Sequence, residues 1–300
     1  MPDTVQTETL ALAAADGRTL AGTLWLPAGG SAPRLAVAIA PATAVPRRLY
    51  DAFARHLAAR GHAVATIDYR GVGDSAHRPL TRDAATMAEW GTLDLPALLD
   101  RLAARWPGTP LALVGHSVGG QLLGLAHNRA LVAAMAGIAA QSGYWGNWPA
   151  PVRYLRALQW HLVVPGLSVL LGRLPGFAVG GTPLPAGVAR QWAAWCRLPG
   201  FIRQAEGGRL ADGFGRWSGP MRLYSIGDDA YAPARAVDAL AGFYTGAQVE
   251  RRHLSLDELG VRSIGHFGFF SRRMPASAWD EVAEWLEEKA AGAAALRRAG

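Results

Sequence analysis

The sequence predicts an α/β fold in which helices cover both faces of a mostly parallel β-sheet. Apolar runs of strand length alternate along the chain with segments whose apolar residues have helical spacing, which is typical of such folds. The chain has 300 residues, half of them hydrophobic, so it is long enough for one large domain with an insertion. Residues 144–219 interrupt the alternation, and we expect them to form that insertion.

The N-terminal part is predicted to open with a β-hairpin and to continue as alternating strands and helices. Residues 7–27 partly alternate in polarity around Asp16-Gly17, a favourable hairpin turn. Short apolar runs then predict strands at 35–41, 62–69, 110–116 and 132–143. Helical spacing of apolar residues predicts helices at 49–61, 87–108 and 118–129.

The chain is expected to return to the sheet after the insertion. Residues 221–229 and 249–255 are predicted strands, and residues 277–299 a closing helix with Ser277 as its N-cap. The core domain is therefore predicted to comprise residues 1–143 and 220–300.

The insertion has an unusual composition, because it holds six of the 11 tryptophans, many prolines and glycines, and no clear strand. We interpret residues 144–219 as a helical lid over a hydrophobic pocket with few charges. Five tryptophans are candidate substrate contacts: Trp145, Trp148, Trp160, Trp192 and Trp195.

Charge and composition exclude several classes of function. The formal net charge is +7, but the arginines are scattered and Lys289 is the only lysine, so we expect no nucleic-acid binding. The single cysteine, Cys196, allows no internal disulfide and no cysteine-based metal cluster. The N-terminus lacks the pattern of a signal peptide, which predicts a cytoplasmic protein. Tryptophan and arginine both favour membrane interfaces, but we do not expect the lid to bind a membrane surface.

A nucleophile is predicted at Ser117, in the pattern Gly115-His116-Ser117-Val118-Gly119, between a strand and a helix. A serine at such a sharp corner takes a strained backbone conformation, and the flanking glycines let strand and helix pass closely. The Val118 N–H is then a candidate oxyanion donor. His116 is expected to pack behind the serine rather than to act as its base.

A serine nucleophile needs a base and an acid that orients the base. In this architecture the chain order is serine, acid, histidine. Asp228 and Asp229 directly follow a predicted strand, and His266 lies in a loop before the last helix. Both aspartates are candidates for the acid on this argument.

The chain resembles the α/β-hydrolases over residues 20–140 and 220–290. The resemblance rests on four stretches, which are DYRGVGDS (68–75), GHSVGG (115–120), GDDAYAP (227–233) and GHFGFF (265–270). In such proteins the acid usually precedes a proline by four positions, which makes Asp229 the first choice and Asp228 the second. Many members carry His-Gly after the third strand, where this chain has Pro41-Ala42. By that position Thr43 supplies the second oxyanion donor, with Ala42 as the alternative.

These residues together predict a serine hydrolase without metal or cofactor. The expected substrate is a small-molecule ester or thioester with a hydrophobic acyl group, cleaved through an acyl-enzyme. An acyltransferase with the same three residues, and a ligand-binding protein without catalysis, stay open as alternatives. A peptidase is disfavoured, because residues 144–205 contain no Asp or Glu to anchor a substrate amine.

Overall fold

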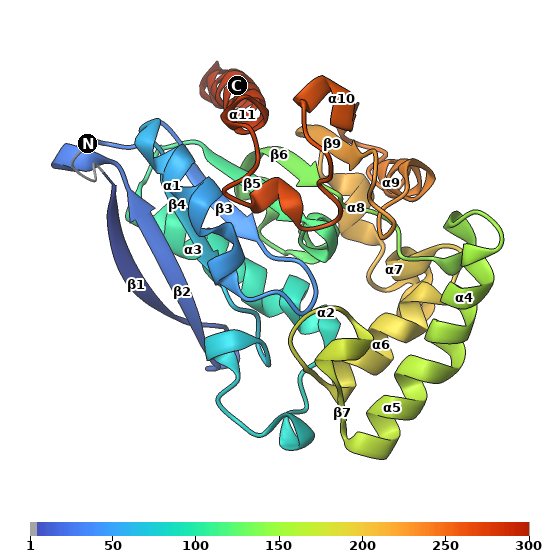
Figure 1. The fold of residues 1–300 in the computed structure, drawn as a ribbon. Coiled ribbons are helices and arrows are strands. Elements are labelled where there is room, and N and C mark those ends of the chain that lie inside the picture. The colour runs from blue at the N-terminus through green and yellow to red at the C-terminus, as the bar shows by residue number, and fades with distance from the viewer. Residues whose placement is uncertain (1–4, 300) are drawn as a thin grey trace.

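The structure, a computed structural model, describes residues 5–299 and is built on an eight-stranded sheet (Figure 1). Strands β1 and β2 pair antiparallel, as do β2 and β4. The other neighbouring strands of this sheet, from β4 across to β10, pair parallel. The order across the sheet is β1-β2-β4-β3-β5-β6-β9-β10. The mostly parallel sheet confirms the predicted fold class. The strands are β1 Gln6–Ala13, β2 Thr19–Leu26, β3 Ala36–Ala40, β4 Ala63–Ile67, β5 Leu111–His116, β6 Val132–Ile138, β9 Pro220–Ile226 and β10 Gln248–Leu254.

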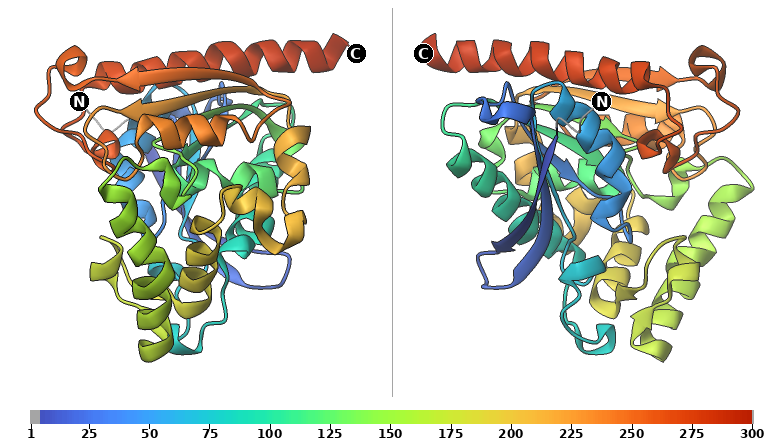
Figure 2. Two further views of the ribbon diagram at one scale, coloured as in Figure 1. Left: turned by 90° about the vertical axis from the view of Figure 1, so that its right-hand side faces the viewer. Right: turned by 60° about the vertical axis from the view of Figure 1, so that its left-hand side comes forward.

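Helices cover both faces of this sheet (Figure 2). On one face α1 (Asp51–Ala59) packs against α11 (Ala276–Ala299), with the rings of Phe53 and Trp279 5.8 Å apart. The other face carries α3 (Leu95–Arg105), which continues from α2 (Met87–Glu89) through a π-helical turn. The short helices α9 (Ala234–Ala241) and α10 (Leu256–Leu259) follow β9 and β10. Strands β3, β5 and β6 are buried along their whole length, as their apolar sequences predict.

Two sequence predictions about helices are wrong. Residues 118–129 do not form one α-helix, because the chain makes two short 3₁₀ turns, Ser117–Gly120 and Leu122–Leu125. Glycine is a poor helix former, which favours short turns over one α-helix in this stretch. Gly124 also lies so close to Phe214 that a Cβ would be 2.5 Å from the ring. The last helix begins at Ala276, so Ser277 lies in its first turn and does not cap it.

Residues 144–219, which we call the inserted segment, connect β6 to β9. Helix α4 (Val152–Leu158) runs through a π-helical turn into α5 (Val164–Leu171), and α6 (Ala186–Cys196) packs beside α5. Helices α7 (Phe201–Gln204) and α8 (Asp212–Arg216) lead back to the sheet. A two-residue ladder, β7 (Arg173–Leu174) with β8 (Leu184–Pro185), was not expected from the sequence. Helices α4, α5 and α6 lie at the end of the molecule away from α11 (Figures 1 and 2).

Across the described residues, none of the helices combines the length and apolar character needed to span a bilayer.

Candidate active site

Ser117 lies at the sharp corner that follows β5. Its φ of 51° is in the left-handed region, which non-glycine residues rarely occupy. A Cβ on Gly115 would lie 2.4 Å from the Gly120 Cα, and one on Gly119 would lie 1.9 Å from the Ala40 carbonyl oxygen. Only glycine fits at these two positions, so the corner depends on the pattern seen in the sequence. The predicted strained turn is therefore present.

His266 and Asp229 are joined by a hydrogen bond. The Nδ1 of His266 is 2.7 Å from Asp229 Oδ2, and both side chains are buried. The other carboxylate oxygen, Oδ1, accepts the N–H groups of Tyr231 and Ala232 at 2.7 and 3.0 Å. These contacts fix the carboxylate just after β9. With its Nδ1–H donated to Asp229, the imidazole presents Nε2 as a proton acceptor.

Asp228 has a different role from its neighbour. Its carboxylate accepts the Ser263 hydroxyl and the N–H groups of Ile264 and Gly265 at 2.8–2.9 Å. Burial raises the pKa of Asp228, but the hydrogen bonds from Gly265, Ser263 and Ile264 outweigh it and lower the pKa below its ordinary value. Asp228 thus secures the loop that carries His266, whereas Asp229 contacts the imidazole itself.

His116 connects the serine corner to the histidine loop. Its Nε2 donates to the carbonyl oxygen of His266 at 2.8 Å, and its Nδ1 accepts the Tyr50 hydroxyl at 2.8 Å. The His116 and His266 ring centroids are 5.1 Å apart. Complete burial lowers the pKa of His116 well below its ordinary value, so the ring is neutral and can accept at one nitrogen. This fits the expected packing role of His116.

Ser117 is the sequence neighbour of His116, so it lies beside the loop of His266. Within the described part of the chain, Ser117 Oγ makes no hydrogen bond, and none joins it to His266. Catalytic hydrogen bonds often tighten only when substrate binds.

Tyr50 distinguishes the two candidate oxyanion donors on the loop after β3. The Ala42 N–H donates to the Tyr50 hydroxyl oxygen at 2.8 Å, so it is already used inside the protein. Thr43 instead lines the same cavity as Ser117 and Val118. This geometry favours Thr43 over Ala42. The role of Tyr50 was not foreseen, because no motif marks it and its partner His116 is 66 residues away.

A small cavity of about 40 Å³ lies over Ser117. Three of the five candidate tryptophans line it, namely Trp148, Trp160 and Trp192. The other two do not: Trp145 packs against Tyr144, and Trp195 is buried against Phe201. Polar groups also reach the wall, and three buried atoms there have no hydrogen-bond partner in the described residues. They are Gln121 Oε1, Gln141 Oε1 and Trp160 Nε1.

Cys196 also lines this cavity and is fully buried. Burial raises the pKa of its thiol well above the usual range, which keeps it protonated and unreactive as a nucleophile.

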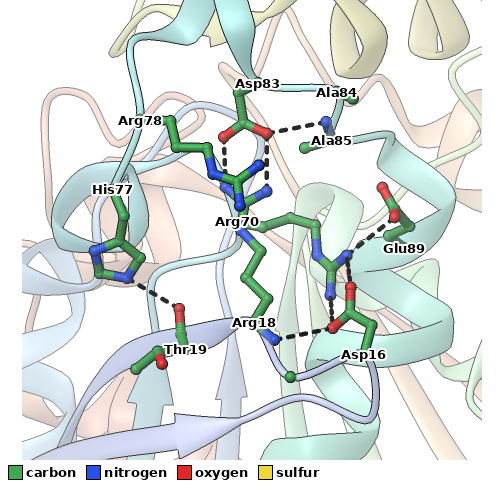
Figure 3. Close-up of a pocket in the computed structure, with 11 residues that line it drawn as sticks. Asp16, Arg18, Thr19, Arg70, His77, Arg78, Asp83, Ala84, Ala85 and Glu89 are labelled. Atoms are coloured by element: carbon green, nitrogen blue, oxygen red, sulfur yellow. Dashed lines mark hydrogen bonds and ion pairs between the residues drawn. The ribbon is translucent and has the colours of Figure 1, made fainter.

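A larger cavity, of about 610 Å³, lies beside the β1–β2 hairpin (Figure 3). Its three carboxylates are all paired with arginines: Arg18 contacts Asp83, and Arg70 contacts Asp16 and Glu89 (Figure 3). Arg70 also reaches the fully buried Asp94 at 2.7 Å. These charges hold the hairpin against residues 70–94, so we do not regard this cavity as the catalytic one.

Comparisons with known proteins point to the same fold. No curated protein matches the sequence. Among solved structures, a soluble variant of monoglyceride lipase from Saccharomyces cerevisiae has a TM-score of 0.66 at 14% identity, covering 95% of this chain and 94% of that chain. Brefeldin A esterase, a bacterial homologue of human hormone-sensitive lipase, has a TM-score of 0.61 at 16% identity, covering 99% and 80%. The esterase domain of a Rhodothermus marinus protein has a TM-score of 0.59 at 19% identity, covering 95% and 99%. At these identities the likeness shows a shared fold.

The family is given by a sequence model described as serine aminopeptidase, S33, which matches residues 31–234. This match spans more than half of the chain and includes Ser117 and Asp229, but it ends before His266. The chain therefore belongs to the S33 family of α/β-hydrolases and is a serine hydrolase.

Proposed function

We propose that this hydrolase cleaves esters or thioesters of hydrophobic acyl groups, with Ser117 as nucleophile, His266 as base and Asp229 as acid. The observation that carries the proposal is the His266–Asp229 hydrogen bond, held beside a serine at a strained strand-to-turn corner. The chain order serine, acid, histidine, together with this hydrogen bond, supports the three roles that acyl transfer needs.

The mechanism follows from this arrangement. His266 Nε2 takes the proton of Ser117, and the serine oxygen attacks the carbonyl carbon of the substrate. The N–H groups of Val118 and Thr43 stabilise the negative charge on the tetrahedral intermediate. His266 then protonates the leaving group, water attacks the acyl-enzyme, and Asp229 stabilises the imidazolium in both half-reactions.

The residues that line the cavity favour a substrate with a hydrophobic acyl group. Trp148, Trp160 and Trp192 supply aromatic surface, and no acidic side chain lines the cavity. A peptidase would need a carboxylate to bind a substrate amine, and residues 144–205 contain no Asp or Glu. A volume of about 40 Å³ holds little more than a small acyl group, so a longer chain requires the tryptophans to move.

The test is covalent labelling of the purified protein with a fluorophosphonate, read by mass spectrometry. We expect one adduct on Ser117, which is absent in Ser117→Ala and strongly reduced in His266→Ala. Ser142→Ala is the matched control, because Ser142 is also buried and its hydroxyl has no partner in the described residues. It should be labelled like the wild type. An adduct that persists in folded Ser117→Ala contradicts the assignment.

A panel of p-nitrophenyl esters and acyl thioesters of graded chain length then identifies the substrate class. Release of free acid supports hydrolysis. Transfer of the acyl group to an added alcohol in preference to water would instead identify an acyltransferase.

A further inference from the structure

The outer side of the inserted segment is strongly apolar. Among the described residues, all but one of the large hydrophobic side chains that are exposed lie between residues 152 and 177. The exception is Tyr231. The most exposed are Phe177 at 83%, Leu170 at 79% and Val169 at 70% of their surface. We call this group the outer face; it consists of Val152, Tyr154, Leu155, Leu158, Leu162, Val163, Val169, Leu170, Leu171 and Phe177.

Most of the outer face lies on the continuous helical stretch 152–171. Leu155, Leu158 and Leu162 follow helical spacing and point away from the core, whereas Trp160, Val164 and Ser168 are buried on the opposite side. A surface helix normally turns charged residues to solvent, and an apolar outer side marks a surface that is covered in function. Helices α4 and α5 form the outer edge of the molecule, far from α11 (Figures 1 and 2).

The charged side chains of the inserted segment near the outer face in sequence, those of residues 144–205, are all arginines. Residues 144–205 contain no Asp or Glu. Arg173 is exposed at the end of α5, and the guanidinium of Arg153 lies 5.0 Å from the ring centre of Tyr154. An apolar helix face with an arginine rim is typical of helices that lie in the surface of an anionic membrane. A second copy of this chain fits poorly, because a symmetric contact would bring the arginines together without carboxylates to pair them.

The helical stretch that carries the outer face also contributes to the serine cavity. It supplies Arg156, Gln159 and Trp160 to the cavity wall. Arg156 lies over the ring of Tyr231 at 4.8 Å, and this ring is 5.4 Å from the ring of His266. The helical stretch that would contact lipid therefore also forms part of the cavity wall through its inner side.

We propose that the outer face binds the surface of an anionic lipid bilayer, with its leucines, valines and Phe177 in the interfacial region and Arg153 and Arg173 at the lipid phosphates. This replaces the sequence-based expectation that the segment does not bind a membrane surface. The proposal stands on the exposed side chains and their charges, and it does not depend on the identity of the catalytic residues.

The test is sedimentation of the full-length protein with vesicles of phosphatidylcholine alone and of phosphatidylcholine with phosphatidylglycerol. The wild type should bind the anionic vesicles and bind the neutral ones more weakly. Arg153→Gln/Arg173→Gln should lower the partition coefficient on anionic vesicles roughly 30-fold, because each of the two arginines near a charged surface contributes about fivefold. Leu162→Ser/Leu170→Ser should lower binding about tenfold or more on both kinds of vesicle.

Matched controls separate this from general charge and from catalysis. Arg101→Gln/Arg273→Gln removes the same charge from exposed positions outside the inserted segment and should bind like the wild type. Ser117→Ala should bind equally well, so a failed catalytic assignment leaves this result unaffected. Lack of wild-type binding to anionic vesicles, or equal loss in both arginine pairs, overturns the proposal. So does a concentration-dependent dimer in analytical ultracentrifugation that Leu162→Ser/Leu170→Ser abolishes, because the outer face is then a contact between copies.

Discussion

Two cavities of this protein, the one beside the β1–β2 hairpin and the one over Ser117, use polar groups in opposite ways. The cavity beside the β1–β2 hairpin is large and charged, and each of its carboxylates is already paired with an arginine (Figure 3). The cavity over Ser117 is small and has no acid in its wall, yet it retains buried polar atoms without partners in the described residues. Unpaired buried polar atoms are costly, so a substrate that forms hydrogen bonds with those in the serine cavity would be stabilised there.

The same contrast applies to the acids. Asp94 and Asp83 are fixed by arginines and stabilise the structure. Among the described residues Asp229 forms no ion pair with an arginine, and instead it accepts backbone N–H groups and the His266 Nδ1–H. A carboxylate held this way remains able to stabilise a positive charge that develops during a reaction. The comparison therefore predicts that mutations at the serine site lower kcat, whereas mutations in the charged cavity lower the free energy of unfolding.

The largest effect is expected from Asp229→Asn. The amide cannot stabilise the imidazolium and favours the wrong tautomer of His266, so kcat should fall about 10⁴-fold. The measurement is steady-state hydrolysis of a p-nitrophenyl ester, with circular dichroism to verify folding. Asp228→Asn is the matched control; it weakens the anchoring of the histidine loop and should lower kcat less than about tenfold. Equal losses in both variants would contradict the assignment of Asp229.

The next largest effect is expected on stability from Arg70→Met. Arg70 is almost completely buried, and its loss leaves Asp94 as an unpaired buried carboxylate. The free energy of unfolding should fall by about 3–5 kcal/mol, as found when one partner of a buried ion pair is removed. The measurement is urea unfolding followed by tryptophan fluorescence.

Arg105→Met is the control for that measurement. Its ion pair with Glu8 is partly exposed, so the loss should be at most about 1 kcal/mol. The folded fraction of Arg70→Met should keep its kcat. A large drop in kcat per folded molecule would mean that the charged cavity takes part in the reaction, and the comparison would fail.

The sequence predicts those parts of the site that depend on local pattern. Gly115 and Gly119 flank Ser117 because no side chain fits there, so the corner can be found from five residues. Asp229 is preferred over Asp228 because it precedes Pro233 by four positions in the sequence. The hydrogen bond between Asp229 and His266 agrees with that choice. The strand order along the chain is likewise set by local runs of apolar residues.

Features that depend on contacts between distant segments could not be predicted. Tyr50 meets His116 only after β3 and β5 have paired, and neither residue carries a motif that names the other. Tryptophan content does not tell which rings face a cavity, and Trp145 and Trp195 do not line the one over Ser117. The exposed leucines of α4 and α5 follow a helical pattern that looks the same whether the outer side is covered or free.

The smallest effect is expected on the pH dependence of stability and comes from His116, which packs behind the serine corner. Burial lowers the pKa of His116 in the folded state, whereas the unfolded side chain binds a proton at about pH 6.5. Below that pH the unfolded state binds more protons, so stability is lost as the pH falls, by about 1.4 kcal/mol per pH unit from this group. His116→Gln can still accept from Tyr50 and donate to His266 but cannot ionise. Urea unfolding from about pH 7.5 to about pH 5 should therefore show a shallower slope in the variant than in the wild type. Equal slopes would mean that His116 binds a proton in the folded protein as readily as in the unfolded one, which would contradict its assignment as a neutral buried ring.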